Sequence, residues 1–106
     1  GEPFEPDNQR VLLPFLQKIR QRYPGKDIWC FTGFRLDDEL LRDGSYPRCE
    51  TTDEMLACID ILVDGRFEQA QKDISLQFRG SRNQRVIDLK KTRAAGQIVL
   101  WSELRR

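Results

Sequence analysis

Asp60-Ile61-Leu62-Val63-Asp64-Gly65 is the stretch of sequence that decides the fold class. Its apolar residues follow one another without alternation, which is typical of a strand buried on both faces in a parallel sheet. Asp64-Gly65 is a turn-forming pair that ends the run. We therefore predict a buried strand over residues 60–63.

Two further apolar runs, over residues 28–31 and 98–101, predict one strand earlier and one strand later in the chain. Short helices are expected in between, one starting at Asp37 or Asp38 and one at the capping box Thr51-x-x-Glu54. Strands that alternate with helices indicate parallel βαβ units with right-handed crossovers. The sequence thus predicts an α/β fold, and its 106 residues suit a single domain spanning 1–106.

A long N-terminal helix is predicted by apolar residues spaced along one face, with Asp7 or Asn8 as the N-cap. The expected buried stripe comprises Leu12, Phe15, Leu16, Ile19 and Tyr23. Pro14 removes a hydrogen bond inside a helix, so either the first turns are kinked or the regular helix begins near Leu13. Pro24-Gly25 ends the helix.

The segment from residue 67 to residue 97 allows more than one structure. Residues 67–73 are polar and predict a turn or a short helix. Ser81-x-x-Gln84 is a second candidate capping box, which would make residues 82–95 helical with Gly96 as the stop. Val86-Ile87-Asp88-Leu89 is equally compatible with extended backbone, so both structures stay open.

Composition argues against several classes of function. Charged residues make up 33% of the chain but the formal net charge is +1, so no general attraction to nucleic acid or membranes is expected. No apolar stretch approaches the roughly 20 residues that span a bilayer, and we expect a cytoplasmic protein with reduced thiols. Histidine is absent, which removes the commonest general base. The cysteines, at positions 30, 49 and 58, lack the spacing of a disulfide framework or a metal knot.

Polar motifs gather where the predicted strands end. Thr32-Gly33, Asp64-Gly65 and Ser102-Glu103 each follow a strand, and Gly1-Glu2-Pro3 precedes the first helix. Ligands of parallel α/β sheets bind outside the carboxyl ends of the strands. We therefore expect these motifs to form one rim that carries the site.

Gly1-Glu2-Pro3 has two interpretations. In a site, the glycine lets a ligand approach the backbone, Glu2 pairs with an ammonium group and Pro3 fixes the turn. The alternative is an ordinary polar terminus without a function. Asp64-Gly65 is likewise either part of the site or a common strand-ending turn.

The basic segment over residues 78–86 is a second candidate site. Its donor groups surround Gly80 and suffice to hold a peptide segment or an anion. These donors are Arg79, Ser81, Asn83, Gln84 and Arg85. The alternative is a solvated basic turn in which Gly80-Ser81 caps a helix.

Several of these segments together resemble one family. Pro24-Gly-Lys-Asp-Ile-Trp29, Thr32-Gly33, Ile61-Leu-Val-Asp-Gly-Arg-Phe67 and Arg79-Gly-Ser-x-Asn-Gln84 are similar in order and spacing to the activases of anaerobic ribonucleotide reductase. Those activases are radical S-adenosylmethionine (SAM) enzymes. Gly1-Glu2-Pro3 matches the last three residues of their Gly-Gly-Glu-Pro motif, which contacts the amino group of SAM. The resemblance spans most of the chain.

The resemblance implies a fold, a reaction and partners. The fold is an incomplete (β/α) TIM-like barrel, of which this chain would be the C-terminal half. The reaction is reductive cleavage of SAM at a 4Fe-4S cluster, after which a 5′-deoxyadenosyl radical abstracts hydrogen from a backbone glycine of the large reductase subunit. The electron would come from a reduced flavodoxin-type donor.

The resemblance and the predicted rim together imply roles for individual residues. Contacts to SAM fall on Gly1, Glu2, Pro3, Thr32, Gly33 and Asp64. Contacts to the reductase fall on Arg79, Gly80, Ser81, Asn83, Gln84 and Arg85. No catalytic residue and no metal ligand is assigned within this chain.

The sequence departs from the family pattern at the iron–sulfur cluster. The cluster-binding Cys-x-x-x-Cys-x-x-Cys motif is absent, and Cys30, Cys49 and Cys58 do not replace it. We therefore expect the full-length protein to be an oxidoreductase and this chain alone to be inactive.

The strand over 28–31 would keep an unpaired edge, which predicts self-association.

Two other classes of function stay open. A small-ligand or nucleotide-binding α/β module would use the same rim without redox chemistry, although no Gly-rich phosphate loop joins a strand to a helix. A protein-interaction module would dock a partner through residues 79–85. A nucleic-acid site is not expected, because basic residues are not interleaved with stacking aromatics.

Overall fold

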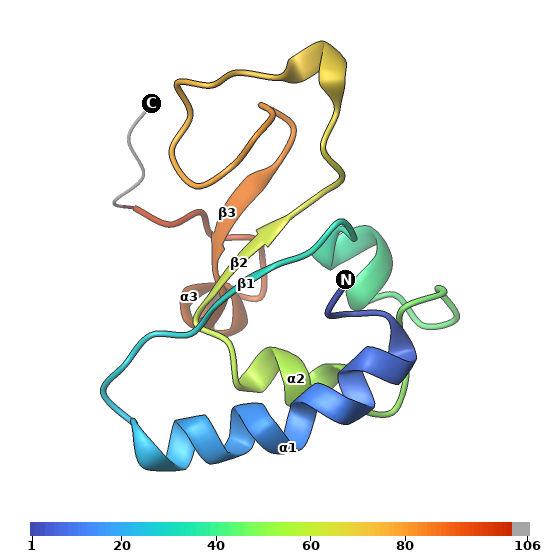
Figure 1. The fold of residues 1–106 in the computed structure, drawn as a ribbon, viewed down its shortest axis with the longest axis vertical. Coiled ribbons are helices and arrows are strands. Elements are labelled where there is room, and N and C mark those ends of the chain that lie inside the picture. The colour runs from blue at the N-terminus through green and yellow to red at the C-terminus, as the bar shows by residue number, and fades with distance from the viewer. Residues whose placement is uncertain (103–106) are drawn as a thin grey trace.

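A small sheet with helices packed against it is the frame of the molecule (Figure 1). The computed structural model describes residues 1–102, so the predicted rim position Glu103 lies outside the described residues. In chain order, the elements are α1 (Pro6–Arg22), β1 (Trp29–Phe31), the π-helical turn η1 (Leu36–Leu40), α2 (Thr52–Ala57), β2 (Ile61–Asp64), the 3₁₀ turn η2 (Gln69–Gln71), β3 (Arg85–Asp88) and α3 (Leu89–Ala95).

The strands lie in the order β1-β2-β3. β1 pairs with β2 in parallel, with Trp29 opposite Ile61, and β2 pairs with β3 in antiparallel orientation, with Asp64 opposite Arg85. Within residues 1–102, β1 pairs only on its β2 side, so its other edge is open. Figure 1 shows α1 and α2 beside each other at one end of the molecule. The long connection from β2 to β3, residues 65–84, lies at the other end and is called the excursion below.

The two faces of the sheet carry different apolar clusters. The larger cluster lies between the sheet and the helices, where Phe4, Leu40, Met55, Leu62 and Ile87 are each fully buried. The smaller cluster, on the opposite face, comprises Ile61, Val63 and Val86, with Trp29 and Trp101 packed against it. The indole rings of Trp29 and Trp101 meet edge to face at 4.9 Å, a favourable arrangement for aromatic pairs.

The two central expectations from the sequence are confirmed as elements. The predicted strand over 60–63 is β2, and all four of its residues are buried. The predicted strand over 28–31 is β1, although its position at the sheet edge leaves Phe31 55% exposed. The two short helices expected between these strands correspond to η1 and α2.

The N-terminal helix differs from its prediction in start and in buried face. α1 begins at Pro6, earlier than Asp7, because proline is well suited to the first position of a helix. The helix continues through Pro14, so the alternative start near Leu13 is wrong. Phe15 is 58% exposed, whereas Leu13 is turned toward the core.

Residues 82–95 are not one helix, so that prediction is wrong. The extended alternative is right, because residues 85–88 form β3 and only residues 89–95 are helical, with Gly96 ending α3 in the left-handed region at φ 69°. Consecutive residues of a strand point to opposite faces. Val86 and Ile87 are both fully buried, one in each cluster, which only an extended backbone between two apolar layers allows.

The third predicted strand, over residues 98–101, is also different from expectation. It forms a single antiparallel bridge, Leu100 to Ile87, beside β3. Parallel pairing is therefore confined to β1 and β2, and the expected all-parallel arrangement is wrong for the C-terminal part of the sheet. The relation to an incomplete (β/α) barrel stays a prediction. Among the described residues, no helix has both the length and the apolar character required to cross a membrane.

Candidate functional site

Glu2 binds the N-terminal segment to the carboxyl end of β1. Its Oε2 accepts hydrogen bonds from the Thr32 hydroxyl at 2.7 Å and from the Phe4 backbone N–H at 2.8 Å. Its Oε1 accepts one from the Gly33 backbone N–H at 2.6 Å. Segments about 30 residues apart in the chain thus meet as the rim predicts, and Glu2, Thr32 and Gly33 form one cluster.

Buried contacts explain why the N-terminal segment takes this position. Phe4 is fully buried in the larger apolar cluster. Gln9, also fully buried, donates hydrogen bonds to the backbone carbonyls of Phe4 at 2.8 Å and Pro47 at 2.7 Å. Asn8 donates to the Glu2 carbonyl at 2.8 Å. The backbone of Glu2 and the residues after it are therefore fixed against the body of the fold.

A hollow of about 380 Å³ opens beside this cluster. Its lining residues are Gly1, Glu2, Pro3, Phe31, Thr32, Gly33, Val63, Gly65, Phe67 and Gln84. The volume lies in the range of small-molecule pockets, about 300–1,000 Å³. Five of the six predicted SAM contacts line it, and this mixture of a carboxylate, backbone groups and aromatic rings suits an amphipathic cation. Hereafter it is called the rim hollow.

Asp64, the remaining predicted SAM contact, does not line the rim hollow. Its carboxylate is fully buried and points to the helix-covered side of the sheet, where it accepts from the Leu36 backbone N–H at 2.8 Å. Arg85 donates to the same carboxylate through Nε at 3.0 Å and through a terminal nitrogen at 2.6 Å. Hydrogen bonding to Asp64 raises the pKa of Arg85. This pair joins β2, β3 and η1.

The residues predicted to bind the reductase are engaged mainly within the chain. The Gln84 side chain donates to the Gly65 carbonyl at 2.9 Å and accepts from the Gly80 N–H at 2.8 Å. Asn83 donates to the Arg66 carbonyl at 2.7 Å, and the Ser81 hydroxyl accepts from the Glu68 N–H at 3.1 Å. Arg79 donates to the Gln84 carbonyl at 2.7 Å. These groups hold the excursion from β2 to β3 against the end of β2.

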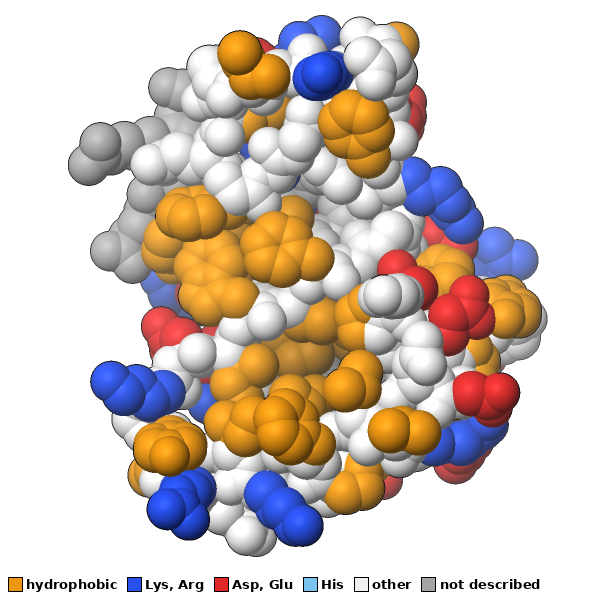
Figure 2. All heavy atoms as spheres, in the orientation of Figure 1, with side chains coloured by type: hydrophobic (Ala, Val, Ile, Leu, Met, Phe, Trp, Pro, Cys, Tyr) orange, Lys and Arg blue, Asp and Glu red, His pale blue; other side chains and the backbone are white. Residues whose placement is uncertain are grey.

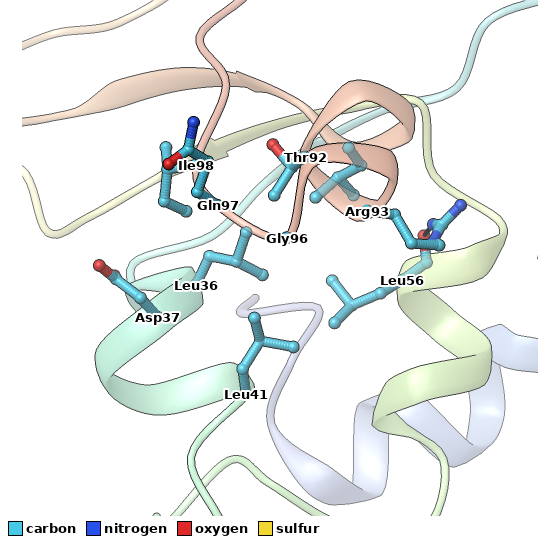
Figure 3. Close-up of a pocket in the computed structure, with 10 residues that line it drawn as sticks. Leu36, Asp37, Leu41, Leu56, Thr92, Arg93, Gly96, Gln97 and Ile98 are labelled. Carbon is cyan, nitrogen blue, oxygen red and sulfur yellow. Dashed lines mark hydrogen bonds between the residues drawn. The ribbon is translucent and has the colours of Figure 1, made fainter.

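A second hollow, of about 330 Å³, lies among η1, α2 and α3 (Figure 3). Leu36, Leu41 and Leu56 point into it, and Asp37 and Arg93 stand on opposite sides. Asp37 is paired with Arg85 at 2.9 Å. None of the predicted SAM contacts lines this apolar groove.

The cysteines do not fit an iron–sulfur cluster. Residues 1–102 contain no group of three or more His, Cys, Asp or Glu side chains that could hold a metal. Burial, with a smaller contribution from the Glu2 carboxylate, raises the pKa of the Cys30 thiol to about 12, and burial also raises that of Cys58. Thiolates are the cluster ligands, so these two thiols are poor ligands. Burial acts to raise the pKa of the Cys49 thiol, but hydrogen bonds with Thr51 and Thr52 lower it. Cys49 nevertheless belongs to no group of three potential ligands within residues 1–102, so the residues present do not fit the cluster.

Sequence reasoning missed the apolar side of the rim hollow. Phe31 was expected to lie in a buried strand, and Phe67 in a polar turn. Phe31 and Phe67 are 55% and 51% exposed, and Figure 2 shows how widely hydrophobic side chains are exposed on one face of the molecule. The available signal was an aromatic residue two positions after the strand-ending Asp64-Gly65 turn, at the edge where ligands bind.

The comparison with protein families decides the membership of the chain. The sequence model of the 4Fe-4S single cluster domain family matches residues 1–87. The chain belongs to this family. The chain is also similar to proteins named anaerobic ribonucleoside-triphosphate reductase-activating protein. No solved structure matches the chain.

Three relatives illustrate the extent of the similarity. The Haemophilus influenzae protein is 43% identical over 79% of this chain and 48% of its own length. The Escherichia coli K12 protein is 43% identical over 85% of this chain and 53% of its own length, and the phage T4 protein is 31% identical over 81% and 47%. The predicted resemblance to these activating proteins is confirmed, and the chain spans about half the length of the curated relatives it matches.

Proposed function

We propose that this chain supplies the SAM-holding side of an activase of anaerobic ribonucleotide reductase, an oxidoreductase of the radical SAM type. The observation that carries the proposal is the cluster of Glu2, Thr32 and Gly33 at the mouth of the rim hollow. Membership of the 4Fe-4S single cluster domain family and the names of the relatives support it.

Glu2 is suited to bind the amino group of SAM. A carboxylate offers about four lone-pair sites, and three are occupied here, two on Oε2 and one on Oε1. An ammonium group can take the remaining site on Oε1. Because the carboxylate is already held in place, little side-chain entropy is lost on binding.

Thr32 and Gly33 orient this carboxylate, and the apolar residues of the rim hollow exclude water from the rest of the ligand. When bound, the cluster supplies the electron that cleaves SAM. No step through it is assigned to this chain, because its cysteines do not fit it. In the proposal the cluster ligands lie outside this chain, and the whole protein has an incomplete barrel fold and acts in the cytoplasm.

The large reductase subunit and a reduced flavodoxin-type donor are the partners of that whole protein. The open edge of β1 is the surface through which isolated copies of this chain would associate.

Calorimetric titration with L-methionine and with 4-(methylthio)butanoate, which lacks the amino group, tests the role of Glu2. We expect the 106-residue chain to bind methionine at least tenfold more tightly, because a charged hydrogen bond contributes about 1.5–3 kcal/mol. Glu2→Gln should remove the difference. The matched control Glu5→Gln, next to α1 but paired with Tyr46, should keep it.

Equal binding of the two compounds would contradict the ammonium role of Glu2. Failure of the chain to bind either methionine or SAM would contradict the proposed function itself. Thermal melts of both variants establish that each is folded before it is titrated.

A further inference from the structure

In the excursion between β2 and β3, residues 81–84 form hydrogen bonds with residues 65–68, the segment directly after β2. The Gly65 carbonyl accepts from Gln84, the Arg66 carbonyl accepts from Asn83, and the Glu68 N–H donates to Ser81. Phe67 lies within this hydrogen-bonded segment, between Arg66 and Glu68. Its backbone position is therefore fixed on both sides.

The Phe67 ring itself rests on Gly80. A Cβ built on Gly80 would lie 3.0 Å from Cδ1 and 3.1 Å from Cε1 of the ring, tight enough that the ring would have to shift by a few tenths of an ångström. Gly80 does not adopt a positive φ, unlike Gly65 and Gly96, so its backbone conformation does not demand glycine. The close approach of the ring is therefore what disfavours a side chain at this position.

Gly80 is in turn held by Gln84, whose Oε1 accepts from the backbone N–H groups of Gly80 at 2.8 Å and Ser81 at 3.2 Å. The ring so supported is 51% exposed and lines the rim hollow. An aromatic ring that is held firmly yet left half exposed at a hollow is placed to contact what enters it.

We propose that Phe67 contacts the adenosyl part of SAM and that the segment over residues 80–84 holds it there. This inference rests on the proposed function. Glu2 binds at the end of β1, whereas Phe67 follows β2, so a ligand anchored by its amino group at Glu2 extends across the strand ends toward the ring. A phenyl face attracts both a sulfonium cation and a flat base.

The assignment changes the role of residues that the sequence associates with a partner protein. Gly80, Ser81 and Asn83 act on the small-molecule site through Phe67, and Gln84, which itself lines the rim hollow, also holds Gly80 in place beneath the ring. They are positioning residues, since none of their hydrogen bonds described above needs a second protein.

Titration of the 106-residue chain with three compounds tests this inference: SAM, L-methionine and 5′-deoxyadenosine. Phe67→Ala should weaken SAM and 5′-deoxyadenosine about tenfold, while methionine binding changes less than about twofold. Phe67→Leu, which keeps apolar area but not the ring face, should fall in between. Ile74→Ala, in the same excursion but 91% exposed and outside the hollow, is the matched control and should bind as the unchanged chain does.

A double-mutant cycle tests the role of Gly80. Gly80→Ala should weaken 5′-deoxyadenosine about threefold to tenfold in the unchanged chain and have no effect when Phe67 is already alanine, because its effect passes through the ring. Equal effects in both backgrounds would overturn the positioning role.

The remaining outcomes separate this inference from the proposed function. Unchanged 5′-deoxyadenosine binding by Phe67→Ala, or an equal loss of methionine binding, overturns the contact assigned to Phe67 and leaves the proposed function standing. If the unchanged chain binds none of the three compounds, the proposed function fails and the inference fails with it.

Discussion

Asp64 and Arg85 lie directly opposite each other in the β2–β3 ladder, and their side chains form a doubly hydrogen-bonded ion pair. The carboxylate is fully buried and the guanidinium side chain is only 20% exposed. A buried charge is tolerated only when it is paired and hydrogen-bonded. Residues that the sequence assigns to a cofactor and to a partner protein are thereby engaged in holding the sheet.

Arg85→Ala should destabilise the fold strongly. The substitution leaves the buried Asp64 carboxylate without its cation, which costs about 3–5 kcal/mol of unfolding free energy. Urea denaturation measures this loss of unfolding free energy. Arg82→Ala, an exposed arginine of the same segment, is the control and should stay within about 0.5 kcal/mol of the unchanged chain. An Arg85→Ala variant as stable as the control would show that the ion pair is not what holds β3.

At the scale of elements, Asp60 links three pieces of the fold. Its buried carboxylate accepts from the Ile28 backbone N–H before β1, from Arg20 of α1 and from Lys90 of α3. Burial acts to raise the pKa of Asp60, but the hydrogen bonds from Ile28, Arg20 and Lys90 outweigh it and lower the pKa below its usual value.

Stability should therefore fall in acid through Asp60. A lowered folded-state pKa means that the stabilisation is present above the unfolded value of about 3.9 and is lost as the pH falls through the folded value. Asp60→Asn should cost about 2 kcal/mol at pH 7. The difference from the unchanged chain should shrink below about pH 4 and vanish at lower pH, as urea denaturation at each pH would measure.

Asp7→Asn is the matched control, since the Asp7 side chain is 99% exposed. It should be nearly neutral at every pH. A cost of Asp60→Asn that stays constant from pH 7 to pH 3 would contradict the role of the charged carboxylate.

The elements also show where sequence reasoning succeeds and where it fails. β2 is predictable because a continuous apolar run needs no knowledge of its neighbours. β3 is not, because Ser81-x-x-Gln84 has the pattern of a capping box, and Gln84 does bond back to the Ser81 N–H, but in a turn that enters a strand. The choice of strand over helix depends on the two apolar layers around Val86 and Ile87, which the local sequence does not contain.

At the scale of the whole molecule, one prediction about the site succeeds for a simple reason. The carboxyl ends of the parallel strands β1 and β2 meet at one edge, so Thr32-Gly33 and Gly65 come together there. The apolar wall was missed because Phe67 depends on its contact with Gly80, 13 positions along the chain from it, and such contacts follow from the path of the excursion.

The Gly33 backbone N–H reports most directly on the central claim, which is that the rim hollow binds the ammonium end of SAM at Glu2. It donates to Glu2 Oε1 at 2.6 Å, the oxygen that an incoming ammonium group would share. In a ¹⁵N-resolved NMR titration of the chain with L-methionine, we predict a saturable shift of the Gly33 amide and none at Gly44, an exposed turn glycine. A Gly33 amide that stays in place, or shifts confined to the apolar groove among η1, α2 and α3, would contradict the account.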